Sequence, residues 1–167
     1  MSATPAFRDR IKELRRIPAG ELIPNPKNRR RHPAKQAAAL RGILSEVGYA
    51  DALVAREDDH GKLLLLDGHL RAGLDPKQLV PVLVLDVSEE EGDKILASLD
   101  PLAAMAETDK SALAELLAGL DIETEALAAA LEGLVPQPPE DFPSKDEGID
   151  TDFKCPKCGF AWSGKQA

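Results

Sequence analysis

The spacing of apolar side chains predicts strands and helices that alternate along the first part of the chain. After Pro33, apolar residues recur at the i, i+3, i+4, i+7 interval of a helix, and Gly48 is expected to end it. Three short runs rich in leucine and valine or in other apolar residues predict strands at 52–56, 62–66 and 81–87. This order of elements predicts a small mixed α/β domain.

The remaining elements are predicted from cap and breaker residues. Ser88 followed by Glu91 has the pattern of a capping box, and Pro101 is expected to stop or kink the helix that begins there. Two further short helices are predicted within 108–133. Residues 7–16 are predicted to form a short basic amphipathic helix, or to stay loose until a partner orders them.

Composition divides the chain into five parts. Its 167 residues suit one compact domain with appendages. The stretch 135–150 holds four prolines and five acids without periodicity, which is typical of an extended, disordered linker. The predicted parts are a basic N-terminal segment (1–16), a mixed α/β domain (17–107), a helical extension (108–133), the linker (134–150) and a cysteine-containing tail (151–167).

Several classes of protein are excluded by what the sequence lacks. No apolar run approaches the ~18 residues of a membrane-spanning helix, and the charged N-terminus has no apolar stretch of a secretory signal. Two cysteines three residues apart cannot build a disulfide framework. The sequence therefore argues against secreted, membrane-embedded, fibrous and disulfide-stapled proteins, and it predicts a cytoplasmic location.

Charge is distributed unevenly along the chain. There are 21 lysines and arginines against 29 acids, a net charge of −8. Residues 1–49 hold eleven basic and four acidic side chains, a net +7, whereas residues 50–167 hold ten and twenty-five, a net −15. A cationic front on an acidic body indicates a local site for phosphate or nucleic acid. The alternative is that Arg29, Arg30 and Arg31 form a solvated loop.

The stretch with the most chemical information is a glycine turn after a predicted strand. A run of four leucines leads into Asp-Gly-His-Leu-Arg at 67–71. Glycine permits a sharp turn and a close approach of the backbone to a ligand. Free amides at the start of the following helix form an anion seat, to which His69 and Arg71 add a donor and a permanent cation. The alternative is an ordinary strand–turn–helix in which Asp67 caps the helix and Arg71 is solvated.

Three motifs follow one another in the order found in a known family. Ile-Pro-Ala-Gly-Glu-Leu-Ile-Pro-Asn-Pro-Lys-Asn-Arg occupies 17–29, the glycine turn 67–71, and Val-Pro-Val-Leu-Val-Leu-Asp 80–86. Over about residues 15–107 the chain resembles the N-terminal domain of the ParB/sulfiredoxin superfamily. Its members include partition proteins that bind and hydrolyse CTP, sulfiredoxins that use ATP, and small-molecule kinases. The resemblance implies a nucleoside triphosphate, CTP or ATP with Mg²⁺, on the glycine turn.

The resemblance also implies which residues bind the nucleotide. Gly68 and Arg71 match the glycine and the second arginine of the partition proteins' Gly-Glu-Arg-Arg turn, and His69 follows the glycine. A second segment is similar to their Asn-Pro-x-x-Pro-Arg region, whose arginine faces the nucleotide. It contributes Asn25 and, for that arginine, Arg29, Arg30 or Arg31.

The chain departs from each branch of the family. Sulfiredoxins have a catalytic cysteine where this chain has His69, which argues against sulfiredoxin chemistry. The kinase branch has a similar Asp-Gly-His-x-Arg turn, but its general-base glutamate lies in the segment here occupied by 25–28, which holds no acid. Glu21 and Asp67 are the nearest acidic candidates for a catalytic role. Partition proteins continue into a helix-turn-helix domain, in place of which this chain has short acidic helices, so sequence-specific reading of DNA is not expected.

The tail carries a second candidate site. Cys155 and Cys158 are spaced to reach one tetrahedral Zn²⁺, as in a zinc-ribbon-like knuckle. A structural zinc site needs about four ligands, so the expected completion is a homodimer in which each chain supplies two cysteines. A redox pair and an unliganded, flexible knuckle are the alternatives. A short ParB-like domain followed by such a tail resembles phage and mobile-element proteins.

Three functions are compatible with these features. The first is a nucleotide-binding, DNA-associated protein in which the nucleotide on 67–71 modulates DNA contact or self-association. The second is an enzyme, a small-molecule kinase or nucleoside triphosphatase, that uses the same pocket. The third is a non-catalytic adaptor that acts through its acidic helices and zinc tail.

Overall fold

The computed structural model describes residues 7–135 and 152–163, which fall into two compact units. The first unit contains β1 (Ile11–Pro18), the short 3₁₀ helix η1 (Ala19–Glu21), α1 (Ala34–Glu46), β2 (Leu53–Glu57), β3 (Leu63–Asp67), α2 (His69–Leu74), β4 (Leu79–Leu85), α3 (Glu89–Ala104), α4 (Lys110–Ala118) and α5 (Glu125–Glu132). The second contains β5 (Phe153–Lys154) and β6 (Ala161–Trp162). The predicted linker, 134–150, lies almost entirely outside the described residues.

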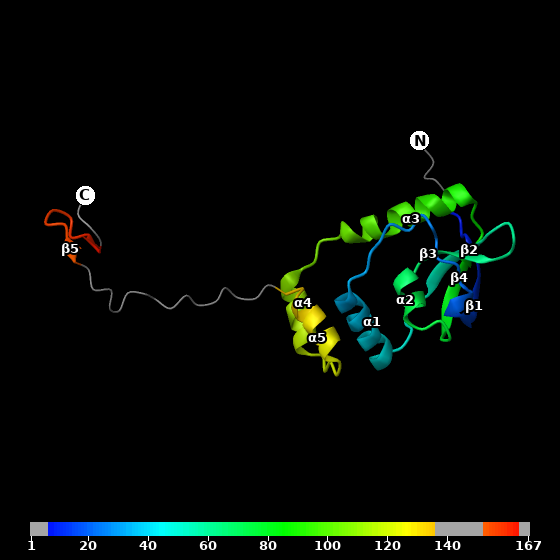
Figure 1. The fold of residues 1–167 in the computed structure, drawn as a ribbon, viewed down its shortest axis with the longest axis horizontal. Helices are drawn as coiled ribbons and strands as arrows, with labels where there is room; N and C mark the ends of the chain where they lie inside the picture. Colours follow the sequence, from blue (N-terminus) through cyan, green and yellow to red (C-terminus); the bar gives the residue numbers. More distant parts are fainter. Residues whose placement is uncertain (1–6, 136–151, 164–167) are drawn as a thin grey trace. The chain divides into compact units, whose positions relative to one another are not determined.

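One four-stranded sheet organises the first unit. Its order is β1-β4-β2-β3, with β1 and β3 antiparallel to their neighbours and β2 parallel to β4. The parallel pair is joined through β3 and α2, and α2 packs against β2 and η1 while α3 packs against β3 (Figure 1). This mixture of strands and helices confirms the predicted mixed α/β class.

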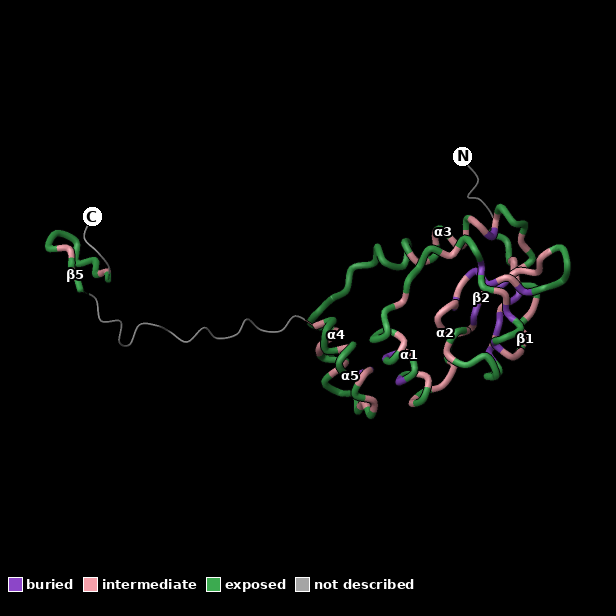
Figure 2. Tube along the Cα trace, in the orientation of Figure 1, coloured by how far each residue is buried: buried purple, intermediate pink, exposed green. Residues whose placement is uncertain are grey.

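The hydrophobic core lies on the central strands of this sheet. Buried and half-buried positions alternate along β4, and the same alternation begins β2 and β3, as expected when one face of a strand is packed. Most of the buried hydrophobic residues of the first unit lie in this sheet (Figure 2). The fully buried side chains of the largest volume are Leu53, Leu65, Val80, Val82 and Val84. The three predicted strands are therefore confirmed within two residues at each end.

The N-terminal segment corrects the prediction of a helix at 7–16. Residues 11–18 form the edge strand β1, which pairs with 79–85 of β4. Glu13, Arg15 and Ile17 are half-buried while the residues between them are exposed, a period-two pattern that the mixture of basic and apolar side chains concealed. The helix prediction was wrong because the unpaired edge of β4, some 65 residues further along the chain, decides the conformation.

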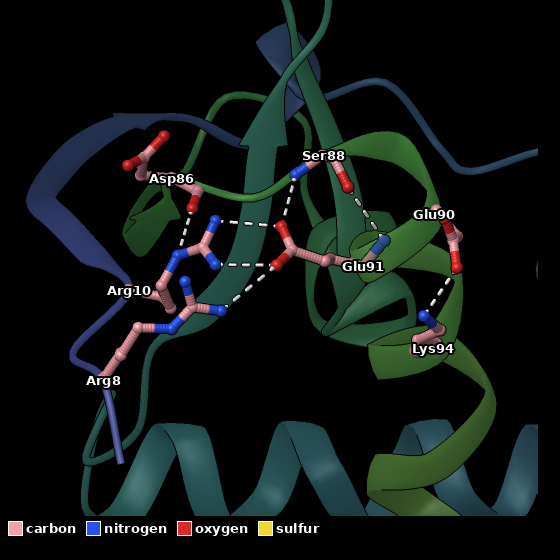
Figure 3. A network of polar contacts seen from close by, with 7 residues as sticks. All are labelled: Arg8, Arg10, Asp86, Ser88, Glu90, Glu91 and Lys94. Carbon is pink, nitrogen blue, oxygen red and sulfur yellow. Dashed lines mark hydrogen bonds and ion pairs between the residues drawn. The ribbon is translucent and has the colours of Figure 1, made fainter. Parts of the chain in front are cut away.

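A polar network ties the segment before β1 to the start of α3 (Figure 3). The predicted capping box is present, because the Glu91 amide donates to Ser88 Oγ at 3.2 Å and the Ser88 amide donates to Glu91 Oε2 at 2.9 Å. Arg10 donates to both carboxylate oxygens of Glu91, at 2.7 and 2.9 Å, and to the Asp86 carbonyl at 2.6 Å. The Arg10 guanidinium and the Ser88 amide lower the pKa of Glu91 to about 2.

Of the two outcomes expected at Pro101, a stop or a kink, the stop is wrong, since α3 continues to Ala104. Both helices predicted within 108–133 are present, and α5 packs on α1. The contact is close at Gly42 of α1, where a Cβ would lie 2.9–3.0 Å from side-chain atoms of Thr124 and Leu127. No helix among the described residues is both long and apolar enough to span a membrane.

Candidate functional site

A pocket of about 400 Å³ lies between the loop before α1, the β3–α2 turn and α3. The turn contributes residues 66–71. The loop contributes Asn28, Arg29, Arg30 and His32, and α3 contributes Leu96, Asp100 and Pro101. Side chains of α1 and residues 48–51 complete the wall. Its volume is within the range of small-molecule sites, about 300–1,000 Å³. Segments far apart in the sequence therefore meet at one concave surface.

The glycine turn is the most constrained part of this pocket. Gly68 has φ +90°, in the left-handed region that disfavours side chains. A Cβ there would lie 2.6 Å from Leu53 Cγ and 3.1 Å from Leu53 Cβ, and Leu53 is fully buried on β2. Both the torsion angle and the space require glycine. The sharp turn expected from the sequence is present, and its residues 66–71 line the pocket.

Arg71 lies in the pocket wall with two carboxylates as partners. Its guanidinium donates to Asp51 Oδ2 at 2.7 Å and to Asp67 Oδ2 at 2.9 Å, and its side chain is 15% exposed. The structure thus excludes the alternative in which Arg71 is a solvated helix residue. It also shows that this cation is already neutralised, so an anion would have to share Arg71 with the two aspartates.

His69 faces a different partner. Its Nε2 accepts a hydrogen bond from the backbone amide of Asn25 at 3.2 Å, which assigns the proton of the neutral ring to Nδ1. Burial lowers the pKa of His69 and so favours the neutral ring. Asn25 is itself buried, and its Oδ1 accepts from the Lys27 amide at 2.9 Å in a turn. Asn25 is not part of the pocket wall, and its contact with the site is the hydrogen bond from its amide to His69.

The three consecutive arginines have different surroundings. Arg29 and Arg30 line the pocket, whereas Arg31 is exposed outside it. Arg30 Nε pairs with Asp100 Oδ2 at 2.6 Å. Arg29 has no carboxylate partner among the described residues, and its Nη2 donates to the carbonyl of Ala97 at 3.4 Å.

A proline explains why that carbonyl is available. In an α-helix the carbonyl of residue 97 would accept the amide of residue 101, but Pro101 has no amide hydrogen. The Arg29 guanidinium takes the place of the missing donor. Pro101 and Asp100 both line the pocket, so the end of α3 orients two arginines of the opposite loop.

Of the two acidic residues that the sequence suggested for a catalytic role, one lines the pocket. Asp67 lines the pocket, whereas Glu21, in η1, does not. Asp51 and Asp100 also line the pocket, and neither belongs to a local sequence motif that would have predicted it. Carboxylates suit Mg²⁺, but no group of three or more His, Cys, Asp or Glu that could hold a metal occurs in the described part of the chain.

Part of the pocket wall is apolar and is formed mainly by α1. Leu40, Ile43 and Leu44 of α1 and Tyr49 line the pocket together with Leu70. The sequence predicted a helix from the spacing of these residues, but periodicity shows that a face is apolar and not what covers it. Here part of that stripe borders the pocket. Burial raises the pKa of Tyr49, whose ring packs against the core.

Ion pairs neutralise part of the basic charge in residues 7–49. Lys12 pairs with Glu57 at 2.6 Å, and Lys27 pairs with Glu89 and Asp93 at 2.9 and 2.6 Å. Residues 7–49 also contain basic side chains that form no ion pair with any other described residue: Arg16, Arg29, Arg31, Lys35 and Arg41. The positive surface available to a polyanion is therefore smaller than the net charge of +7 implies.

The two cysteines lie on the hairpin of the second unit. Cys155 is half-buried, Cys158 is exposed, and both are free. The Cys155 amide donates to the Phe160 carbonyl at 2.7 Å, and the Gly159 amide donates to the Cys155 carbonyl at 2.9 Å. Hydrogen bonds from the backbone amides of Cys158 and Lys157 lower the pKa of the Cys155 thiol. The turn therefore stabilises a thiolate at Cys155.

Comparison with known proteins finds similarity among solved structures only. No protein-family model and no curated protein matches the chain. Among solved structures, the chain is similar to the C-terminally truncated chromosome-partitioning protein ParB from Caulobacter crescentus, complexed with CTP-gamma-S, at 22% sequence identity and a TM-score of 0.49. The match covers 64% of this chain and 60% of that one. What the pocket binds therefore has to follow from its own residues.

Proposed function

We propose that the chain binds a nucleoside triphosphate in this pocket, with its phosphates between the glycine turn and the loop that carries Arg29 and Arg30. The observation that carries the proposal is that one pocket of about 400 Å³ is lined by both segments that the sequence assigned to a nucleotide. A guanidinium fork suits phosphate oxygens in particular. The apolar part of the wall, around Leu40 and Tyr49, offers a surface for a nucleobase.

The charge balance of the pocket favours binding together with Mg²⁺. Three arginines (Arg29, Arg30 and Arg71) and three aspartates (Asp51, Asp67 and Asp100) line it. A triphosphate alone would add negative charge beside these carboxylates. Mg²⁺ is commonly held by substrate phosphates and one or two carboxylates, which would offset that repulsion. We therefore expect the affinity for a triphosphate to depend strongly on Mg²⁺.

The same loop connects the pocket to DNA in this proposal. Arg29 and Arg30 face the pocket, while Arg31 and Lys35 are exposed and form no ion pair within the described residues. A nucleotide that repositions Arg29 and Arg30 would also move the two exposed cations next to them. Nucleotide occupancy would thereby change contact with the DNA backbone, or the association of one copy with another.

Calorimetric titration with CTP, ATP, GTP and ADP, each with and without Mg²⁺, tests the nucleotide step. A lost hydrogen bond to a charged group corresponds to about 1.5–3 kcal/mol, so Arg29→Ala is expected to weaken triphosphate binding roughly 10- to 150-fold. Arg16→Ala is the matched control, because Arg16 is an unpaired arginine on β1 outside the pocket. No uptake of any triphosphate at millimolar concentration, or equal effects of the two variants, would refute the proposal.

The DNA step has its own measurement. Affinity for duplex DNA should fall steeply with salt, and losing one phosphate contact should reduce the logarithmic slope by about one. Arg31→Ala should therefore lower the slope, and the difference should grow when the favoured nucleotide is present. Binding that ignores both salt and nucleotide would remove DNA from the proposal and leave nucleotide binding intact.

A second candidate, phosphoryl transfer or hydrolysis, is favoured by the carboxylates in the pocket wall. Asp67 lines the pocket, and its Oδ2 accepts a hydrogen bond from Arg71 at 2.9 Å, a contact that an acceptor hydroxyl would have to share. Phosphate release, and phosphoryl transfer to small hydroxyl compounds, would be followed for the chain and for Asp67→Asn. Turnover that Asp67→Asn abolishes would support the enzyme. Saturable nucleotide binding without turnover would refute the enzyme and support a protein that only binds the nucleotide.

A further inference from the structure

The two cysteines of the second unit lie on one tight turn, the turn that joins β5 to β6. The Cys155 amide donates to the Phe160 carbonyl at 2.7 Å, and the Gly159 amide donates to the Cys155 carbonyl at 2.9 Å. Gly159, with φ +78°, lets the chain reverse immediately after the second cysteine. Two cysteines three residues apart on such a turn suit one edge of a coordination tetrahedron, in which each Zn–S bond is about 2.3 Å long.

This edge is half of a closed zinc site. Soft thiolate ligands favour Zn²⁺, and structural zinc sites are nearly always four-coordinate. Within residues 7–135 and 152–163 no third His, Cys, Asp or Glu joins the two cysteines in a group that could hold a metal. The chain contains no other cysteine. Two further thiolates therefore have to come from outside this chain, and a second copy supplies an identical pair.

The hairpin also needs stabilisation from outside itself. Each of its strands has two residues, and an isolated two-stranded hairpin is marginally stable at best. Its apolar content is a row of three stacked rings, with Phe153 and Phe160 at 5.7 and 6.2 Å from Trp162 between ring centroids. Phe160 is 67% exposed. Small units of this kind usually gain their stability from metals, disulfides or assembly.

We propose that Cys155 and Cys158 of two chains bind one Zn²⁺ through four thiolates, so that the metal joins two copies tail to tail. The site is independent of the pocket of the first unit. The metal supplies both the missing coordination and the second hairpin, against which the exposed ring of Phe160 has a surface to pack. Binding releases the thiol protons, since thiolates are the ligands.

Cobalt substitution in the full chain tests this stoichiometry. The reduced, chelator-treated protein would be titrated with Co²⁺ under anaerobic conditions, followed by displacement with Zn²⁺. We expect thiolate-to-cobalt charge transfer, the visible bands of a tetrahedral four-sulfur site, and an end point at one metal per two chains. Sedimentation should show a doubled particle mass with zinc. If the chain already forms a dimer through another surface, the particle mass will not change, and the cobalt end point and visible spectrum then test the proposal.

Variants separate this proposal from the others. Cys158→Ser should abolish the half-equivalent end point, whereas Lys157→Ser, the matched control in the same turn, should keep it. Arg29→Ala should also keep it, so failure of the nucleotide proposal would leave this result unaffected. An end point of one metal per chain with fewer than four sulfurs would overturn the proposal. So would the absence of cobalt bands, with or without a Cys155–Cys158 disulfide under mild oxidation.

Discussion

Gly68→Ala is expected to destabilise the first unit because Gly68 meets two separate requirements. Alanine at φ +90° enters the left-handed region, which disfavours a Cβ by about 1–2 kcal/mol. Its Cβ would also lie 2.6 Å from Leu53 Cγ. Leu53 is fully buried between strands and cannot move aside cheaply, and overpacking of this kind costs about 1–3 kcal/mol.

Gly48→Ala is a matched control for the first of these effects. Gly48 has φ +88°, nearly the same as Gly68, but a Cβ there would have nothing within 4 Å. Both substitutions also reduce the freedom of the unfolded chain, which stabilises by about 0.4–1 kcal/mol. These common effects cancel in the comparison. Gly68→Ala should therefore be more destabilising than Gly48→Ala by about 1–3 kcal/mol, the overpacking contribution alone.

Urea unfolding followed by far-ultraviolet circular dichroism measures both variants under the same conditions. A double-mutant cycle adds Leu53→Ala, which removes the side chain that the new Cβ would strike. The two substitutions should then couple favourably, so that the double variant is more stable than the sum of the single effects. Equal losses for the two glycine variants, or additive effects in the cycle, would refute the account of the turn.

Two further predictions concern contacts away from the pocket. The pKa of Glu91 is lowered from 4.5 to about 2 in the folded state, so its contribution to stability is present above pH 4.5 and is lost as pH falls towards 2. Glu91→Gln should accordingly show a smaller fall in urea midpoint than the parent over that range, and an unchanged fall would contradict the role of Arg10. Gly42→Ala would bring a Cβ to 2.9 Å from Thr124, so it should separate α5 from α1. Amide hydrogen exchange should then rise in α5, at a loss of about 1–3 kcal/mol, and unchanged protection of α5 would argue against that packing.

Local signals predicted much of the fold. The capping box of Ser88 and Glu91 located the start of α3, because a cap involves residues only three apart. The strands with buried valines and leucines were found because a packed strand has a distinctive composition. The same methods missed β1, whose partner strand is distant in sequence, and of the two outcomes expected at Pro101 they did not exclude a stop, which does not occur.

The pocket was predicted in part for the same physical reason. The turn around Gly68 has a local motif, and the structure brings it together with Arg29 and Arg30. Asp51 and Asp100 carry no motif, since they enter the pocket only through the packing of the segments that bear them. Their ion pairs change the electrostatics from a row of free cations to a balanced set, which no count of basic residues could reveal.

Pro101 sets an order in which the arginines of the pocket become available. Detaching Arg29 breaks only one long, exposed hydrogen bond, 3.4 Å, to the uncharged carbonyl of Ala97. Detaching Arg30 or Arg71 separates opposite charges and leaves an aspartate without its partner. An incoming anion therefore recruits Arg29 first and competes with carboxylates only for the other two. Because Pro101 of α3 has no amide hydrogen, Arg29 is bound to a carbonyl and not to a carboxylate. Among the arginines of the pocket, Arg29 is therefore the one that an anion can engage without breaking an ion pair.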